Sequence, residues 1–169
     1  AGVDPDLALD ALSELKPTEG RGVAFYAQLS RGRVIDVVDE SYNANPASMR
    51  AAFGALKLRK PSGQGRKIAV IGEMLELGPD SRALHAALAE PLITAGVDQV
   101  IGVGEGARAL MDALPAEHRA AWCETAESAI ETLSELARDG DVVLVKGSNA
   151  SGVHKLVSSL RDKAKPASA

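Results

Sequence analysis

Short β-branched runs alternate with segments of helical periodicity along this chain, and this alternation restricts the fold more than any other feature. Beyond residue 45 the connections between successive runs are long enough for a helix, which suits parallel pairing of strands. We therefore predict an α/β fold, with a Rossmann-like, mostly parallel sheet and helices on both faces. Pro91 should kink or end one of the helices near Glu90. Strands are predicted over residues 67–71, 97–103, 120–123 and 141–145, and helices from about residues 46, 79, 105, 125 and 150.

The N-terminal part of the chain has a different pattern. The runs Val23–Leu29 and Arg33–Val38 are separated only by Ser30–Gly32, which predicts an antiparallel N-terminal hairpin. A further helix is predicted to begin near Asp4 and to end at Pro17, because proline forces the preceding residue out of the helical region. This first helix therefore lies outside the alternating α/β pattern.

Composition excludes several classes of protein. A chain of 169 residues with 46% hydrophobic content is long enough for one well-buried core. A net charge of −4, with scattered Lys and Arg, provides no basic field for nucleic acid. No apolar run approaches the roughly 18 residues of a membrane span, and His85, His118 and His154 lack metal-ligand spacing. The single Cys123 fits a reducing compartment. We expect a monomeric, cytoplasmic protein with no metal site, no nucleic-acid partner and no membrane insertion.

The segment Asp39–Met49, DESYNANPASM, places a cluster of polar groups directly after a predicted strand. The C-terminal tips of strands are where α/β sheets hold ligands. Asn45 can cap the next helix and Pro46 suits its first position, so one interpretation is a turn with a well-capped helix. The length and polarity of the segment favour a ligand site, because a carboxylate can accept hydrogen bonds from a ribose and the amides and phenol can bracket a base.

Two other predicted strands end in polar residues. The segment Lys146–Asn149 leads into a predicted helix whose free amides, with Lys146 and the Ser148 hydroxyl, could hold a carboxylate. The alternative is that Ser148 or Asn149 only caps that helix. Glu73 and Glu76 follow the strand over residues 67–71, and they are interpreted either as ligand-facing or as carboxylates of a structural turn.

A competing motif predicts a different function. Gly102–Ala107 fits G-x-G-x-x-[G/A] between a strand and a helix, and Glu124 lies at a suitable distance downstream to meet a ribose. This would make the chain a free-standing dinucleotide-binding module. Small residues also occur where a helix packs closely on a sheet, and this fingerprint usually marks the first unit of its fold, so the module is our second hypothesis.

Four segments together resemble one known family in order and spacing. They are Leu15–Gly22 (LKPTEGRG), Asp39–Met49, Ile68–Gly78 (IAVIGEMLELG) and Val143–Ser148 (VLVKGS). On these residues the chain resembles the Mur ligases, in the branch that adds D-alanyl-D-alanine to UDP-N-acetylmuramoyl-tripeptide. The resemblance covers nearly the whole chain.

The resemblance implies a division of the chain. Residues 1–17 would be the last helix of an ATP-binding central domain, residues 18–163 the Mur ligase C-terminal domain, and residues 164–169 a mobile tail. The sequence contains no G-x-x-x-x-G-K-[ST] phosphate loop. We therefore expect the C-terminal piece of a larger ligase, inactive alone, with ATP and Mg²⁺ held mainly by the central domain.

The resemblance also implies a reaction and roles for individual residues. The full enzyme would transfer the γ-phosphoryl group of ATP to the carboxylate of the tripeptide precursor, and the amine of D-alanyl-D-alanine would attack the resulting acyl phosphate. Arg21 would steady the transferring phosphate, because a guanidinium matches phosphate oxygens. Asp39 or Glu40 would accept from the ribose, Tyr42, Asn43 and Asn45 would line the nucleotide, and Glu73, Lys146, Ser148 and Asn149 would face the substrate.

Overall fold

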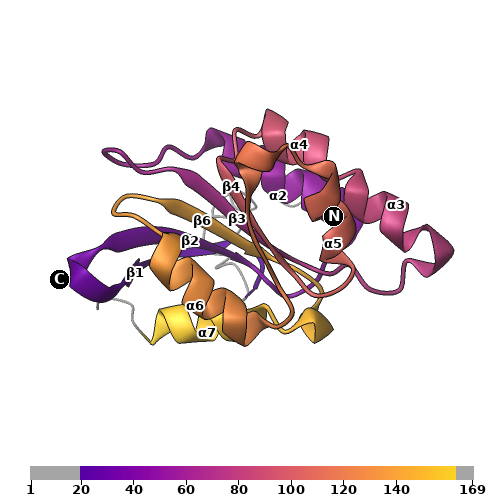
Figure 1. Ribbon diagram of the computed structural model, residues 1–169. Helices are drawn as coiled ribbons and strands as arrows, with labels where there is room; N and C mark the ends of the chain where they lie inside the picture. The colour runs from indigo at the N-terminus through magenta and orange to yellow at the C-terminus, as the bar shows by residue number, and fades with distance from the viewer. Residues whose placement is uncertain (1–19, 163–169) are drawn as a thin grey trace, which may run out of the picture.

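The structure, a computed structural model, describes residues 20–162 and contains a six-stranded sheet in the order β1-β2-β6-β3-β4-β5 (Figure 1). β1 pairs with β2 in antiparallel fashion, and the other neighbouring pairs are parallel. The predicted hairpin and the mostly parallel sheet are therefore confirmed. The strands are β1 (Val23–Gln28), β2 (Val34–Glu40), β3 (Lys67–Gly72), β4 (Gln99–Val103), β5 (Arg119–Cys123) and β6 (Val142–Lys146).

Helices cover both faces of the sheet, as predicted. One face carries α2 (Pro46–Leu58), α3 (Ser81–Ala86), α4 (Ala89–Thr94) and α5 (Ala107–Ala113), and the other carries α6 (Ala126–Leu136) and α7 (His154–Arg161) (Figure 1). Side chains of each strand alternate between the two layers, so that Val38 packs on the α2 side and Val37 on the α7 side. The sheet thus has a hydrophobic core on each face.

The start of α2 follows directly from the sequence. The Asn45 side chain accepts from the Ser48 amide, the Ser48 hydroxyl accepts from the Asn45 amide, and Pro46 occupies the first position. Apolar residues at helical spacing then lie in the core, among them the fully buried Met49 and Phe53. This capping box fixes the point at which the polar segment after β2 ends.

Two helix predictions were wrong in detail. The helix expected around Pro91 ends at Ala86, and Pro91 lies in the first turn of α4, where a proline costs no hydrogen bond because those amides are free in any helix. The helix expected from Ala150 begins only at His154, because residues 149–151 form a 3₁₀ turn and Gly152 has φ +78°.

Some sequence predictions lie outside the described residues. The helix before Pro17 and the tail over residues 164–169 belong to this group, so they stay predictions. Between residues 20 and 162, no helix has both the length and the apolar character needed to cross a bilayer.

Candidate functional site

The candidate site lies at the carboxyl edge of the sheet, where β2, β6 and β3 end side by side. In the register of these strands, Lys146 of β6 is paired with Glu40 on one side and Ile71 on the other. The chain leaves β2 and β3 toward the face that carries α2 and α3, whereas it leaves β6 toward the face that carries α7. This reversal is a topological switch point, the place where open α/β sheets bind ligands.

The two acidic residues at the end of β2 point to opposite faces. Asp39 is buried, and its Oδ2 accepts from the Gly20 amide at 3.1 Å and from Arg161 Nη2 at 2.9 Å. Its Oδ1 accepts from the amide and the hydroxyl of Ser41. Burial opposes ionisation, but these hydrogen bonds outweigh it and hold the pKa of Asp39 below 3.8. Glu40 is therefore the carboxylate that stays available for a ligand.

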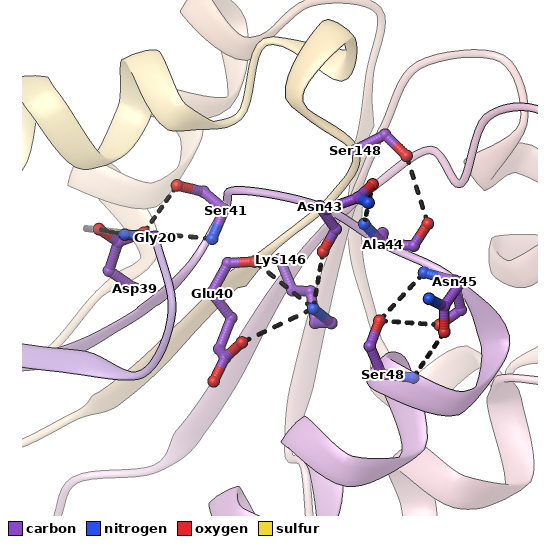
Figure 2. Close-up of polar contacts among 10 residues, drawn as sticks. All are labelled: Gly20, Asp39, Glu40, Ser41, Asn43, Ala44, Asn45, Ser48, Lys146 and Ser148. Atoms are coloured by element: carbon purple, nitrogen blue, oxygen red, sulfur yellow. Dashed lines mark hydrogen bonds and ion pairs between the residues drawn. The ribbon is translucent and has the colours of Figure 1, made fainter. Parts of the chain in front are cut away.

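Lys146 holds the polar segment after β2 from below (Figure 2). Its side chain is buried, and Nζ donates to the Asn43 carbonyl at 2.9 Å and lies 3.7 Å from Glu40 Oε2. Burial lowers the pKa of Lys146 below 10.5, while the Glu40 carboxylate opposes that change. The head group of Lys146 thus contacts Glu40 and the loop, and its role toward a substrate carboxylate stays a prediction.

Arg21 and Tyr42 form the exposed rim of the site. The Arg21 guanidinium lies over the Tyr42 ring, 4.4 Å from its centroid. Asn43 is exposed and its Oδ1 accepts from the next amide along the chain. The Asn45 oxygen is engaged in the cap with Ser48, which confirms its capping role, while its contact with a nucleotide stays a prediction.

A groove of about 320 Å³ runs between the loops after β2, β3 and β6. Ser148 is buried at its edge, where Oγ accepts from the Leu75 amide at 3.0 Å, so it joins two loops instead of capping a helix. Glu76 lies in the groove with φ +61°, a left-handed conformation that is uncommon outside glycine. The groove is lined by Tyr42, Asn43, Leu75, Glu76, Ser148, Asn149 and Ala150.

Glu73 does not face this groove. Its Oε1 accepts from the Gly106 amide at 2.6 Å, and a Cβ added to Gly104, which has φ +86°, would meet the Glu73 side chain at 2.7 Å. His85 is buried and holds the loop after β3 in place, because its Nε2 accepts from the Met74 amide at 2.9 Å. The turn that fits the dinucleotide fingerprint is thus filled by an internal carboxylate at the place where a pyrophosphate would bind.

Replacing Glu73 by alanine should lower the free energy of unfolding by about 1–3 kcal/mol, because the Gly106 amide loses its acceptor in a partly buried position. Urea unfolding of the chain measures this change. Glu124→Ala is the matched control. Because the Glu124 carboxylate is exposed, this variant should change the free energy of unfolding by less than about 0.5 kcal/mol. Equal stability of both variants would contradict a structural role for Glu73.

Sequence reasoning missed three residues that shape the site. Gly20, Ser41 and Arg161 surround the Asp39 carboxylate. Gly20 belongs to residues 20–22 before β1, here called the entry segment, whereas Ser41 follows β2 and Arg161 ends α7. In the sequence, only the two glycines that flank Arg21 indicated a special backbone conformation there. In the structure, Gly20 and Gly22 both have positive φ. No group of three His, Cys, Asp or Glu side chains is placed to hold a metal ion within residues 20–162.

The fold and the site define a class of protein: an α/β domain whose candidate site lies at a switch point of the sheet. The model of the Mur ligase family described as "Mur ligase, glutamate ligase domain" matches residues 27–149. The chain therefore belongs to the Mur ligase family, as a C-terminal domain of that family.

Similar proteins agree with this assignment. UDP-N-acetylmuramoyl-tripeptide--D-alanyl-D-alanine ligases from Rickettsia prowazekii and Escherichia coli are 33% and 34% identical to the chain, over 92% and 95% of it. MurF ligase from Thermotoga maritima, solved in complex with ADP, superposes on 96% of the chain with a TM-score of 0.72 and 27% identity. The chain spans about a third of each of these proteins, 33% and 34% of the two ligases and 34% of the solved chain.

Proposed function

We propose that this chain is the C-terminal domain of an ATP-dependent ligase that joins D-alanyl-D-alanine to UDP-N-acetylmuramoyl-tripeptide. The observation that carries the proposal is the Glu40 carboxylate, held 3.7 Å from the buried Lys146 ammonium at the switch point of the sheet. The names of the most similar ligases supply the substrates. On this proposal residues 18–163 are the C-terminal domain and residues 1–17 the last helix of the central domain.

In the proposed reaction, the substrate carboxylate attacks the γ-phosphorus of ATP and ADP leaves, which gives an acyl phosphate. The amine of D-alanyl-D-alanine then attacks the acyl carbon, loses a proton and displaces phosphate, which forms the new amide bond. Most of the ATP site and the Mg²⁺ site belong to the central domain. Closure of the two domains would bring Arg21 and Glu40 onto the nucleotide. We also propose that the enzyme works as a monomer in the cytoplasm.

The residues of this chain have separate tasks in that reaction. Arg21 lies on the exposed rim, from which its guanidinium can reach the transferring phosphoryl group. Glu40 accepts hydrogen bonds from the ribose, and Tyr42 and Asn43 line the nucleotide. The part of the groove that is lined by Ser148 and Asn149 receives the dipeptide.

A chimera tests the proposal directly. The chain replaces the corresponding third of the Escherichia coli ligase, and phosphate release is measured with both the tripeptide precursor and D-alanyl-D-alanine present. We expect release that requires both substrates, and none from the chain alone. A folded chimera that binds ATP but forms no pentapeptide product would overturn the proposal, and so would NAD binding by the chain.

In the full-length ligase, Glu40→Ala should lower kcat/KM for ATP about 10- to 100-fold, because a hydrogen bond to a charged group contributes about 1.5–3 kcal/mol. Glu40→Gln should recover part of the loss, since the amide oxygen can still accept from a hydroxyl group. Steady-state kinetics at varied ATP measures the effect. Glu135→Ala, an exposed carboxylate on α6, is the control and should behave as the parent enzyme.

A further inference from the structure

The last helix of the domain contacts the entry segment through a single buried carboxylate. Arg161, at the end of α7, donates from Nη2 to Asp39 Oδ2 at 2.9 Å, and the Gly20 amide donates to the same oxygen at 3.1 Å. The Asp39 side chain is 3% exposed and that of Arg161 is 31% exposed. Asp39 Oδ2 thus binds both α7 and the segment of Gly20, which lie more than a hundred residues apart in the sequence.

The arginine itself is held in place on the sheet. Its guanidinium lies over the Phe25 ring of β1, 4.7 Å from the centroid. A stacked guanidinium with a carboxylate partner keeps a defined orientation, because the planar group is fixed by both contacts. Arg161 is therefore a rigid connection between α7 and the hairpin edge of the sheet.

The entry segment is also fitted closely against the loop after β2. The Tyr42 amide donates to the Gly20 carbonyl at 3.2 Å, and the Gly22 amide donates to the Asp39 carbonyl at 2.8 Å. A Cβ added to Gly20 would come within 2.7 Å of Tyr42 Cβ. Any shift of Gly20 would consequently move Arg21 and Tyr42, the two residues of the exposed rim.

We propose that Arg161 is a positioning residue: through Asp39 it fixes Gly20 and so places Arg21 and Tyr42 for the nucleotide. In this role Arg161 acts through Asp39. The effect on turnover depends on the proposed ligase function, whereas the fixing of Gly20 does not. This assigns a role in nucleotide recognition to a helix on the far face of the sheet from α2.

The first experiment uses the chain itself and does not depend on ligase activity. Arg161→Met should change the NMR amide shifts of Gly20, Arg21 and Tyr42, and should move the acid-unfolding midpoint to higher pH. The pH shift follows because Asp39 loses a cation that favours its charged form. Arg161→Lys should restore part of both effects. Unchanged amide shifts at Gly20 and Arg21 would overturn the proposal.

Arg108→Met is the matched control. Arg108 also stacks on an aromatic ring, Trp122, at 3.5 Å, and pairs with a carboxylate, Glu105, at 2.6 Å, but it lies on α5 at the opposite edge of the sheet. Its variant should leave the Gly20 and Tyr42 amides unchanged. Equal disturbance of those amides by both variants would mean a general loss of packing, which would also overturn the proposal.

The second experiment uses the full-length ligase. Arg161→Met should lower kcat/KM for ATP about tenfold, a loss typical of residues that orient the groups in direct contact with a ligand. KM for D-alanyl-D-alanine should stay unchanged. Combined with Asp39→Asn, it should add little, because both changes break the same contact. Fully additive losses would overturn the proposal. A ligase inactive before any substitution would refute the proposed function but not the NMR result.

Discussion

Arg21→Ala in the full-length ligase is expected to lower kcat by about 10²–10³-fold, the usual loss when one group that stabilises transition-state charge is removed. The side chain is exposed, and its contact with Tyr42 is a cation–π stack that contributes about 0.5–1 kcal/mol at an exposed site. Stability should therefore change little while turnover collapses. Single-turnover measurement of acyl-phosphate formation separates this step from the later attack of the amine.

Two further variants define what Arg21 does. Arg21→Lys keeps the charge but loses the planar fork that matches phosphate oxygens, so it should recover only a small part of the rate. Arg138→Ala removes an exposed arginine just before β6, at the amino ends of the parallel strands and so away from the site, and should not alter kcat. An Arg21→Ala enzyme that turns over at the parent rate would remove Arg21 from the mechanism.

Asp141→Ala is expected to lower the free energy of unfolding by about 3–5 kcal/mol. Asp141 is fully buried at the amino end of β6 and accepts from the amides of Arg66 and Arg138 at 2.7 and 2.8 Å. It also accepts from Arg66 Nη2 at 3.0 Å, so its removal leaves that guanidinium partly buried without its carboxylate. Urea unfolding of the chain gives the change directly.

The neighbouring Asp139 offers the comparison. It is exposed and accepts from the Val34 amide at 2.8 Å, so Asp139→Ala should cost only about 1 kcal/mol. Asp141→Asn should fall between the two, since it keeps the shape of the side chain but loses its charge. Similar losses in the Asp139 and Asp141 variants would show that burial of the ion pair is not what stabilises this end of the sheet.

Local sequence patterns predicted the corresponding parts of the fold correctly. The hairpin around Ser30–Gly32, the helix cap at Asn45 and the apolar face of α2 depend on residues within a few positions of one another. The break near Pro91 was expected, but not its position, because a proline is tolerated in a first turn. The delayed start of α7 was missed because an apolar pattern shows the buried face of a helix but not its first residue, and here a 3₁₀ turn that ends at Gly152 comes first.

The site was only partly predictable, because many of its contacts join residues that are far apart in the sequence. Residue types at strand ends indicated the carboxyl edge of the sheet, and Tyr42, Asn43, Ser148 and Asn149 do line one groove there. Glu73 was interpreted either as ligand-facing or as part of a structural turn, and its carboxylate accepts from the Gly106 amide in the Gly104–Gly106 turn. That partner lies about thirty residues away along the chain, so no spacing rule connects the two.

The sequence by itself determined the α/β class, the strand tips that carry polar groups and the family. Only the tertiary structure decided which polar group contacts which partner. Asp39 and Glu40 are adjacent in the sequence, but the pleat of β2 sends one to Arg161 and Gly20 and the other toward Lys146. The physical reason is that a carboxylate's availability depends on the donors that folding brings to it, and these come from distant segments.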